Sequence, residues 1–442
     1  MSGTGFLRRD RVGHALSRVL KDAAEDLPPP EHAEAFGAIF DRFGTARLVL
    51  LGEATHGTSE FYRARAAISR HLIRHHGFNI VAVEADWPDA TRIDRHVRHG
   101  AADPGRSEVF ARFPGWMWRN EEVLEFVDWL RAENEHRTRS AQVEFRGLDI
   151  YSLSASIAAV LDYLDRVDPK GARQARNRYG CLTPWQESPS AYGHYAVMGG
   201  DTCEGQVHDQ LMTLLHRRLD YAARDGDSFF NAAQNARIVR TAEEYYRIMY
   251  RGSRESWNLR DRHMFDTLQR LMAHRPRAKA IVWAHNSHIG NAAATAMGWE
   301  GEFNIGELCR TAYGVDMAAI GFGTDRGTVA AASDWDSPME IKQVRPARAD
   351  SYEFLMRQCG HARALFDWRA RNVQLRDLLC EPRLERAIGV VYRPDNELLS
   401  HYFRAVMAEQ FDAMVWFETS RAVTPLAAGR PAGTPETYPF GL

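Results

Sequence analysis

Seven short apolar runs, rich in β-branched and aromatic residues, limit most strongly how this chain can fold. They are Arg47–Leu51, Asn79–Val83, Val143–Leu148, Ala278–Trp283, Met317–Phe322, Ala387–Tyr392 and Ala413–Phe417. Runs of this length and composition predict strands that are buried on both faces, as in a parallel sheet. Helical patterns over Ser59–His76 and Glu121–Arg137 separate the first three runs. This alternation predicts an α/β fold with a mostly parallel central sheet flanked by helices.

A long helical stretch interrupts the series of strand-like runs. From about Ser154 to Ala273 helix-type patterns dominate, whereas a chain of 442 residues could otherwise hold about three domains of ordinary size. We therefore predict four parts in one α/β protein. They are an N-terminal helix and Pro-rich turn (1–30), a first half of the α/β core (31–153), an inserted helical subdomain (154–273) and a second half of the core (274–442).

Charge and composition exclude several classes of protein. The 56 Lys and Arg residues nearly balance 58 Asp and Glu residues, so no strong field attracts nucleic acid or an anionic membrane. The sequence has neither an apolar run of about 18 residues nor a signal-peptide pattern at its start. Five scattered cysteines without a CxxC pair argue against a disulfide framework. We expect a cytoplasmic protein with a small-molecule partner, no nucleic acid or membrane partner, and an oligomeric state left open.

Polar side chains follow the predicted strands at their carboxyl ends, where open α/β sheets carry their chemistry. The first four runs are followed by Glu53 and His56, by Glu84, Asp86 and Trp87, by Asp149, and by His285, Asn286 and His288. Buried carboxylates and imidazoles are costly unless they are paired or used, so this set predicts a shared site. Helix capping is an equally good explanation for Asp149, but imidazoles are poor caps.

Arg65 lies on the apolar face of the helix predicted for Ser59–His76. Long side chains in a helix lean toward its N-terminus, so the guanidinium is expected to point back at the loop that carries Glu53 and His56. The alternative is a buried ion pair with Glu53 or Glu84 that only stabilises the fold.

Several well-known catalytic motifs are absent. The sequence contains no GxSxG, GxxxxGK[ST], HExxH or GxGxxG, which disfavours nucleophile-elbow hydrolases, phosphate loops and dinucleotide binding. Because no Ser or Cys lies in a recognisable nucleophile setting, one His and two Glu suggest direct activation of water by a general base.

Four segments resemble motifs of the erythromycin esterase family. They are Gly52–Phe61, Val83–Pro88, Glu255–Met264 and Trp283–Gly290. The resemblance implies an α/β core with an inserted helical part. It also implies a hydrolase of a carboxylic ester or lactone, with macrolide ring opening and antibiotic resistance as its best-known role, and no covalent enzyme intermediate.

The resemblance also implies six catalytic positions. His56 is the general base and Glu53 the carboxylate beside it, and the others are Arg65, Glu84, His285 and His288. We expect His56 to remove a proton from water, with Glu53 or Glu84 orienting it. Arg65, with His285 or His288, is expected to stabilise the oxyanion.

Substrate contacts are predicted at a second set of positions. They are Asp86, Trp87, Asn286, Trp116 and Trp118. Asn258, Arg260 and Asp261 also belong to a family-like motif, where a clamp between the insertion and the core is as compatible with the sequence as a substrate contact.

Two other functions use the same residues. Glu53, His56, Glu84, His285 and His288 are plausible ligands for a divalent metal, which would make the protein a metal-dependent hydrolase. We predict no cofactor and keep the metal as the alternative. The third function is non-catalytic binding of a bulky amphipathic molecule in a pocket lined by tryptophans.

Overall fold

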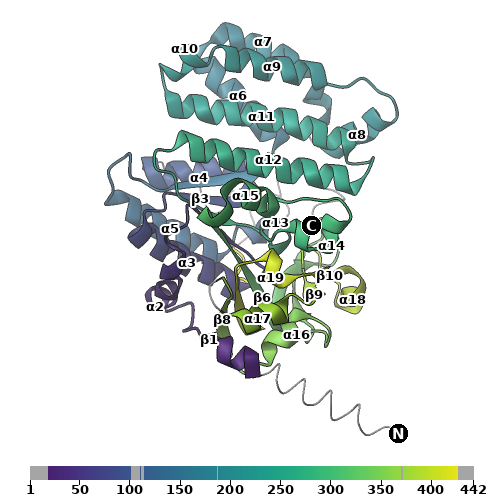
Figure 1. Ribbon diagram of the computed structural model, residues 1–442. Coiled ribbons are helices and arrows are strands. Elements are labelled where there is room, and N and C mark those ends of the chain that lie inside the picture. The colour runs from purple at the N-terminus through teal and green to yellow at the C-terminus, as the bar shows by residue number, and fades with distance from the viewer. Residues whose placement is uncertain (1–17, 101–109, 111–113, 187, 370–371, 427–442) are drawn as a thin grey trace.

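A nine-stranded sheet runs through the part of the chain that the structure describes (Figure 1). This structure is a computed structural model, and it describes residues 18–100, 110, 114–186, 188–369 and 372–426. The strands of the sheet are β1 (Glu25–Asp26), β2 (Leu48–Leu51), β3 (Ile80–Asp86), β4 (Glu144–Asp149), β5 (Ala280–Trp283), β6 (Met317–Ala332), β7 (Met339–Val344), β8 (Arg363–Asp367) and β11 (Ala413–Ser420). Their order is β1-β8-β11-β6-β2-β5-β3-β4, and β7 pairs with β6. A separate two-stranded sheet consists of β9 (Arg383–Arg386) and β10 (Tyr402–Ala405).

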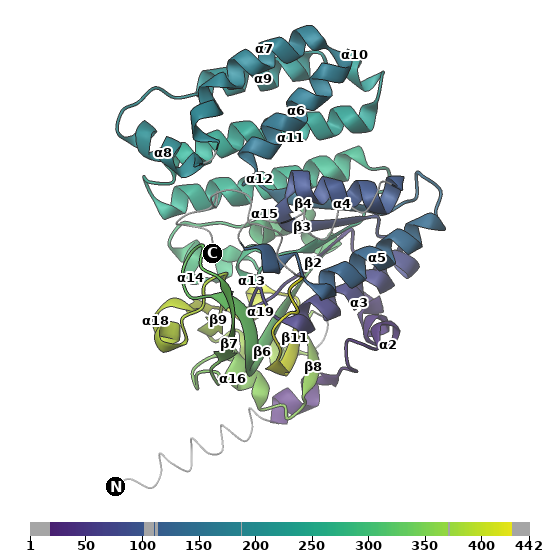
Figure 2. The ribbon, with the colours of Figure 1, turned by 180° about the vertical axis from the view of Figure 1, so that it is seen from behind.

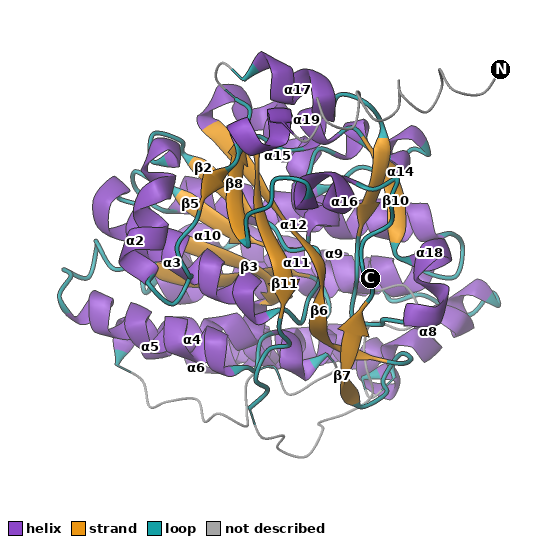
Figure 3. Cartoon of the chain, turned by 90° about the horizontal axis from the view of Figure 1, so that it is seen from below, coloured by secondary structure: helices purple, strands orange, loops and turns teal. Residues whose placement is uncertain are grey.

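Six neighbouring strands of the large sheet, from β11 to β4, all run parallel. Six of the seven apolar runs in the sequence supply these six strands. β8, β1 and β7 join the sheet antiparallel, and β6 and β7 reach beyond the other strands (Figure 3). The predicted α/β fold with a mostly parallel central sheet is therefore confirmed.

Helices cover both faces of the sheet (Figure 3). Because side chains alternate along a strand, β2 places Val49 and Leu51 in one core and Leu48 and Leu50 in the other. The first core is closed by α2 (Ala33–Ala38), α3 (Ser59–His76) and α5 (Glu121–Glu135). The second is closed by α12 (Ser253–His274), α15 (Ile305–Tyr313), α16 (Tyr352–Arg357), α17 (Val373–Leu379) and α19 (Met407–Gln410). α4 (Trp87–His99) packs beside β4.

Short helices connect these elements. They are α13 (Asn286–Ile289), α14 (Ala296–Trp299), α18 (Glu397–Ser400), and the 3-10 helices η1 (Ile39–Phe43), η2 (Gly115–Met117), η3 (Gly180–Trp185), η4 (Ala292–Ala294), η5 (Gly314–Asp316) and η6 (Pro394–Asn396).

Helix α3 shows how local sequence sets the position of a site residue. It begins at Ser59, and it ends before Gly77, whose φ of 71° lies in the left-handed region that favours glycine. The backbone N–H of Gly77 returns to the carbonyl of Leu72 and satisfies one of the last carbonyls of the helix. The helix predicted for Ser59–His76 is confirmed, and Arg65 lies fully buried on it.

Six helices form a third core at one end of the molecule. They are α6 (Leu153–Val167), α7 (Pro169–Tyr179), α8 (Pro189–Val197), α9 (Glu204–His216), α10 (Arg218–Ala222) and α11 (Gly226–Ile248). Figures 1 and 2 both place these helices beyond α12, on the side away from the sheet. The division of the chain at residues 154 and 273 stays a prediction.

Two further predictions concern the N-terminus and membrane spans. Residues 18–23 are helical, and the rest of the predicted N-terminal helix lies outside the described residues. Among the helices of the described part, none is long and apolar enough to cross a bilayer.

The strand predicted at Ala387–Tyr392 is wrong. This run makes only isolated bridges, from Ile388 to Thr55 and from Val391 to Ala332. Its apolar side chains are buried against the loop after β2 and the outer half of β6, so burial without strand pairing explains its composition. Strand pairing occurs just before this run, in β9, which pairs with β10.

The cysteine prediction also needs correction. Cys181 of η3 and Cys203, which precedes α9, form a disulfide with their Cα atoms 6.0 Å apart. The odd count and wide spacing of the cysteines could not show that two of them meet within the third core.

We expect substitution of Leu50 by Ala to lower the free energy of unfolding by about 2 to 5 kcal/mol, because the change leaves a cavity in the second core. Leu50 is fully buried on a central strand. The matched control is Leu399→Ala, on a side chain that is 90% exposed, with an expected change within about 0.5 kcal/mol. Urea unfolding measures both, and equal losses would contradict this assignment of the core.

Candidate active site

Glu53, His56 and Arg65 meet in the loop after β2, as the sequence predicts. Nδ1 of His56 lies 2.9 Å from Oε1 of Glu53, and Nη2 of Arg65 donates to Oε2 of Glu53 at 2.6 Å. All three side chains are buried. The guanidinium of Arg65 lies 4.4 Å from the ring of Tyr62 and 5.2 Å from that of Trp283, contacts that favour a buried cation. Nη2 of Arg65 therefore holds the Glu53 carboxylate, while Nε and Nη1 are buried without a hydrogen-bond partner among the described residues.

The contact with Glu53 sets which nitrogen of His56 carries the proton. A carboxylate that accepts from Arg65 offers only acceptor oxygens, so Nδ1 of His56 is the donor in this pair. The neutral imidazole then has its lone pair on Nε2. A His in this state is equipped to accept a proton.

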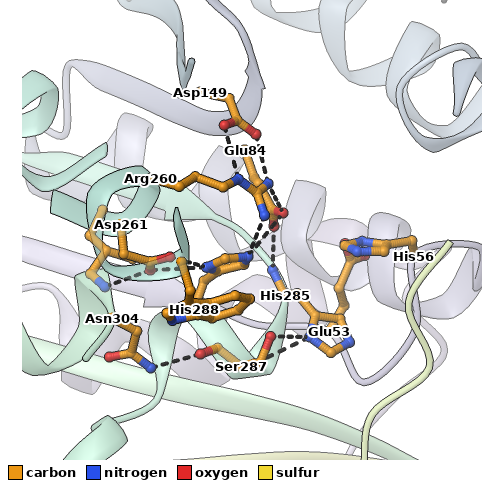
Figure 4. Close-up of polar contacts among 12 residues, drawn as sticks. Glu53, His56, Glu84, Asp149, Arg260, Asp261, His285, Ser287, His288 and Asn304 are labelled. Atoms are coloured by element: carbon orange, nitrogen blue, oxygen red, sulfur yellow. Dashed lines mark hydrogen bonds and ion pairs between the residues drawn. The ribbon is translucent and has the colours of Figure 1, made fainter. Parts of the chain in front are cut away.

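His285 starts the short helix after β5. Its backbone N–H donates to Oε2 of Glu84 at 2.9 Å, and its Nδ1 accepts from the backbone N–H of Ser287 at 3.2 Å (Figure 4). His285 is therefore the side-chain cap of α13. The expectation that an imidazole would not cap is wrong here, because a neutral ring offers one acceptor nitrogen.

The capping bond gives His285 the opposite tautomer to His56. Burial and the nearby His56 hold the pKa of His285 well below its usual range, against the opposing effects of Glu84 and of the Ala54 carbonyl. Since Nδ1 accepts, the neutral ring carries its proton on Nε2. This nitrogen is buried and makes no hydrogen bond of ordinary geometry among the described residues, although the carbonyl of Ala54 lies close enough to raise the pKa of His285. The two rings lie 4.8 Å apart between centroids. A base nitrogen and an N–H donor thus lie on neighbouring rings.

Arg260 of α12 joins the ends of two strands. Its Nε and Nη2 donate to the carboxylate of Asp149 at 3.0 and 2.7 Å, and Nη2 also donates to Oε1 of Glu84 at 2.8 Å (Figure 4). Asp149 caps no helix, because the residue before α6 is Ser152. The sequence left both roles open. Two sequence features pointed to these residues: the position of Asp149 at the end of a predicted strand and the family-like motif around Arg260.

His288 is held between two carboxylates. Nδ1 lies 2.9 Å from Asp261, Nε2 lies 3.3 Å from Glu84, and the ring stacks on Trp257 with centroids 4.5 Å apart. Burial lowers the pKa of His288, but Asp261 and Glu84 outweigh burial and raise it to about 9. Both nitrogens have partners inside the protein, so His288 is not placed to donate to a substrate.

Glu84 is a charged group that holds other residues in place. Burial opposes its charge, but His288 and Arg260 outweigh burial and hold the pKa of Glu84 well below its usual range. One oxygen accepts from Arg260, and the other accepts from the backbone of His285. Glu84 therefore orients the loop of His285 and does not contact His56 as Glu53 does.

Asn258 and Asp261, whose roles the sequence left open, attach α12 to the loop before α15. Asn258 donates to the carbonyl of Gly301 at 3.1 Å and accepts from the N–H of Phe303 at 2.9 Å. Asp261 accepts from the N–H of Ile305 at 2.9 Å as well as from His288. These contacts are those of a clamp between the helix and the core.

Comparisons with known proteins identify the family of this chain. The model of the family described as erythromycin esterase matches residues 73–420. The chain belongs to the erythromycin esterase family. Erythromycin esterase type II of Escherichia coli is 22% identical over 431 residues, which cover 89% of this chain and 94% of that protein. The family and this relative's name indicate a hydrolase.

Two solved structures share the fold of this family member. A Bacillus cereus protein is 19% identical with a TM-score of 0.80, and the match covers 94% of this chain and 99% of that one. An erythromycin esterase mutant in its open conformation is 18% identical with a TM-score of 0.63, and the match covers 90% and 95%.

Two predicted substrate contacts lie inside the fold of this family member. Trp87 is fully buried, and its Nε1 donates to Oδ1 of Asn231 at 2.8 Å. Asn286 is also fully buried, and its amide bonds the backbone of Phe322 at 2.9 and 3.2 Å. Neither side chain is open to a ligand, because each lies beneath the strand ends.

The other three predicted contacts lie near the site but are placed differently. Asp86 ends β3 and directly precedes α4. Trp116 and Trp118 are buried in the first core, and Nε1 of Trp118 donates to the carbonyl of Glu84 at 2.9 Å. Trp118 therefore supports the strand end that carries Glu84, and substrate contact by Asp86, Trp116 or Trp118 stays a prediction.

The predicted metal ligands do not fit a divalent ion in this arrangement. The ligand atoms of the five predicted residues do not converge, because no three of them lie within 4.8 Å of one another in the described structure. Among the described residues, three ligand atoms converge within 4.8 Å in one group only, formed by Asp41, His71 and His76 at the far end of α3.

Replacement of Arg260 by Met is expected to lower the free energy of unfolding by about 3 to 5 kcal/mol, because Asp149 would be left as an unpaired buried charge and Glu84 would keep only His288 as a cationic partner. The control on the same helix is Arg254→Met, since more than half of the Arg254 side chain is exposed and its partner Glu255 is exposed too. Its expected change is within about 1 kcal/mol. Urea unfolding at pH 7 compares the two, and a similar small loss in both would contradict the assigned ion network.

Proposed function

We propose that this protein hydrolyses a carboxylic ester or lactone by general-base activation of water at His56. The observation that carries the proposal is the placement of the two rings: Nδ1 of His56 lies 2.9 Å from Glu53, Nδ1 of His285 accepts from Ser287, and the ring centroids are 4.8 Å apart. This placement favours a lone pair on Nε2 of His56 beside an N–H on Nε2 of His285. Family membership supports a hydrolase, and the names of the relatives make a macrolide lactone the first substrate to test.

In the proposed reaction, Nε2 of His56 takes a proton from water while the hydroxide oxygen bonds to the carbonyl carbon. The Glu53 carboxylate stabilises the resulting imidazolium, and Arg65 keeps that carboxylate oriented. Nε2–H of His285 donates to the oxyanion of the tetrahedral intermediate. When the bond to the leaving alkoxide breaks, the alkoxide takes the proton from His56, and acid and alcohol are released.

The proposed roles sharpen the expectations drawn from the sequence. Arg65 and His288 were candidates for the oxyanion, but Arg65 is held on Glu53 and His288 between Asp261 and Glu84. Nε2 of His285 and two nitrogens of Arg65, Nε and Nη1, are buried donors without a hydrogen-bond partner among the described residues. His285 is the proposed donor to the oxyanion because its ring lies 4.8 Å from that of His56 between centroids. The water and oxyanion positions therefore fall between His56 and His285.

His56→Ala is expected to lower kcat by about 10²- to 10⁴-fold, the usual contribution of a general base. Mass spectrometry of macrolides and of simple aryl and alkyl esters, incubated with each protein, measures the rates. The control is His75→Ala, an exposed histidine of α3, which is expected to keep full activity.

Two outcomes of this screen would contradict the proposal. Folded His56→Ala with full activity would remove His56 from the reaction. Tight binding of a macrolide without turnover of any ester by the wild type would favour a binding protein instead.

We propose that the reaction needs no metal, because the ligand atoms of the five predicted metal ligands do not converge in the described structure. Dialysis against EDTA, with elemental analysis to verify metal removal, is expected to leave the hydrolysis rate unchanged. A rate that falls on chelation and returns on addition of Zn²⁺ or Mn²⁺ would contradict this.

A further inference from the structure

The segment Arg383–Ile388 contacts the two loops that carry the proposed catalytic residues. The backbone N–H of Ile388 donates to the carbonyl of Ala54 at 2.8 Å, inside the loop that carries Glu53 and His56. From the same segment, Glu385 of β9 accepts from Nδ2 of Asn286 at 3.3 Å. One short stretch thus contacts both the loop after β2 and the loop after β5.

Asn286 fixes these two loops relative to each other. Its backbone N–H donates to the carbonyl of Glu53 at 2.8 Å, and it directly follows His285. Its side chain bonds both the N–H and the carbonyl of Phe322 on β6. A Cβ at position 52 would overlap Oδ1 of Asn286, so Gly52 gives the amide its space. A shift of this amide would move Glu53 and His285 together.

Glu385 is a fully buried carboxyl without a cation partner. The guanidinium of the neighbouring Arg386 is used elsewhere, since it donates to the carbonyls of Thr324, Asp325 and Arg345 and pairs with Glu397. The groups that face Glu385 are Asn286, Gln410 of α19, and Glu353 of α16. Tyr352 is the other titratable group near Glu385, and its hydroxyl bonds backbone atoms.

Several buried acceptors around Glu385 lack a donor, even though the side chains of Asn286 and Gln410 both hydrogen-bond its carboxyl. Oε2 of Glu385, Oε2 of Glu353 and Oε1 of Gln410 are buried acceptors with no partner among the described residues. A proton on Glu385 supplies that donor, and a neutral carboxyl avoids the cost of an unpaired buried charge. Burial, and then the charge of Glu353, raise the pKa of Glu385 to about 8.

We propose that Glu385 is a positioning residue of the active site, a neutral carboxyl that holds Asn286 and thereby aligns the Glu53–His56 pair with His285. The role in alignment rests on the proposed hydrolysis. The neutral state of the carboxyl is a property of the fold and is measured separately.

Ionisation of Glu385 removes the donor and places a second negative charge beside Glu353. A carboxyl whose pKa is raised from 4.5 to about 8 by folding contributes stability that is complete below pH 4.5 and is lost as pH rises through about 8. Stability should therefore decline between about pH 4.5 and 8 and level off above pH 8, and the alignment of the two loops should be lost as pH rises through about 8.

The test compares wild type with Glu385→Gln, which stays neutral and keeps an acceptor oxygen for Asn286. Stability is measured by urea unfolding at pH 6.5 and 9, and kcat and KM from pH 6 to 10 on an ester from the hydrolysis screen. A group with a pKa of 8 is about nine-tenths ionised at pH 9, so wild-type kcat is expected to fall about tenfold between pH 7 and 9, with KM little changed. Glu385→Gln is expected to lose this alkaline limb and most of the fall in unfolding midpoint.

Two further variants complete the design. Glu381→Gln is the matched control on an exposed side chain two residues before β9 and should behave as wild type. Glu353→Gln removes the neighbouring charge, so it should shift the alkaline limb and the stability loss to lower pH, and it serves as the test where Glu385→Gln does not fold.

Each outcome bears on one statement. An alkaline limb and stability loss that are unchanged in Glu385→Gln, or unmoved in Glu353→Gln, would overturn the proposal. A stability effect without any effect on the kcat profile would overturn the positioning role. Absence of ester turnover in the wild type would refute the proposed hydrolysis, and the unfolding data would still report on Glu385.

Discussion

The buried guanidinium of Arg260 is the contact on which the rest of the active site depends. It joins Asp149 at the end of β4 to Glu84 at the end of β3, and it comes from α12, which packs between the sheet and the third core. Taking such charges out of water costs several kcal/mol per ion unless each has a partner. The arrangement is stable only when the helix and both strand ends are in place together.

Through Glu84, the contact of Arg260 also positions the proposed reacting groups. Glu84, held by Arg260 and His288, accepts the backbone N–H of His285 and so positions that ring. His285 and His288 are only three residues apart, yet one is neutral and the other charged, because one caps a helix and the other lies between carboxylates. Different surroundings give residues of the same type different pKa values, so that one fold can provide both a proton acceptor and fixed charges.

A formal net charge of −2 on 442 residues says little about this site. The charges that matter are few, buried and paired, and they lie at the carboxyl ends of β2, β3, β4 and β5. The neutral carboxyl of Glu385 extends the same principle beneath the site, since a group without a cation partner keeps its proton. The overall balance of charge fits a small-molecule enzyme, and the local pairing gives it its chemistry.

The sequence by itself determined the features that depend on neighbours along the chain. The six parallel strands follow from short apolar runs, and α3 follows from its start at Ser59 and its end at Gly77. The meeting of Glu53, His56 and Arg65 could be predicted, because one loop and the first turns of one helix contain all three.

Only the tertiary structure decided the contacts between residues that are far apart in the chain. Arg260 lies 111 residues from Asp149 and 176 from Glu84, and Glu385 lies 99 from Asn286. Such pairings depend on how helices and strand ends pack, and no local pattern encodes that geometry. The same reason explains why Ala387–Tyr392 looked like a strand and why Trp87 and Asn286 looked open to a ligand. Apolar composition reports burial, whereas the partner that buries a residue is chosen by the whole fold.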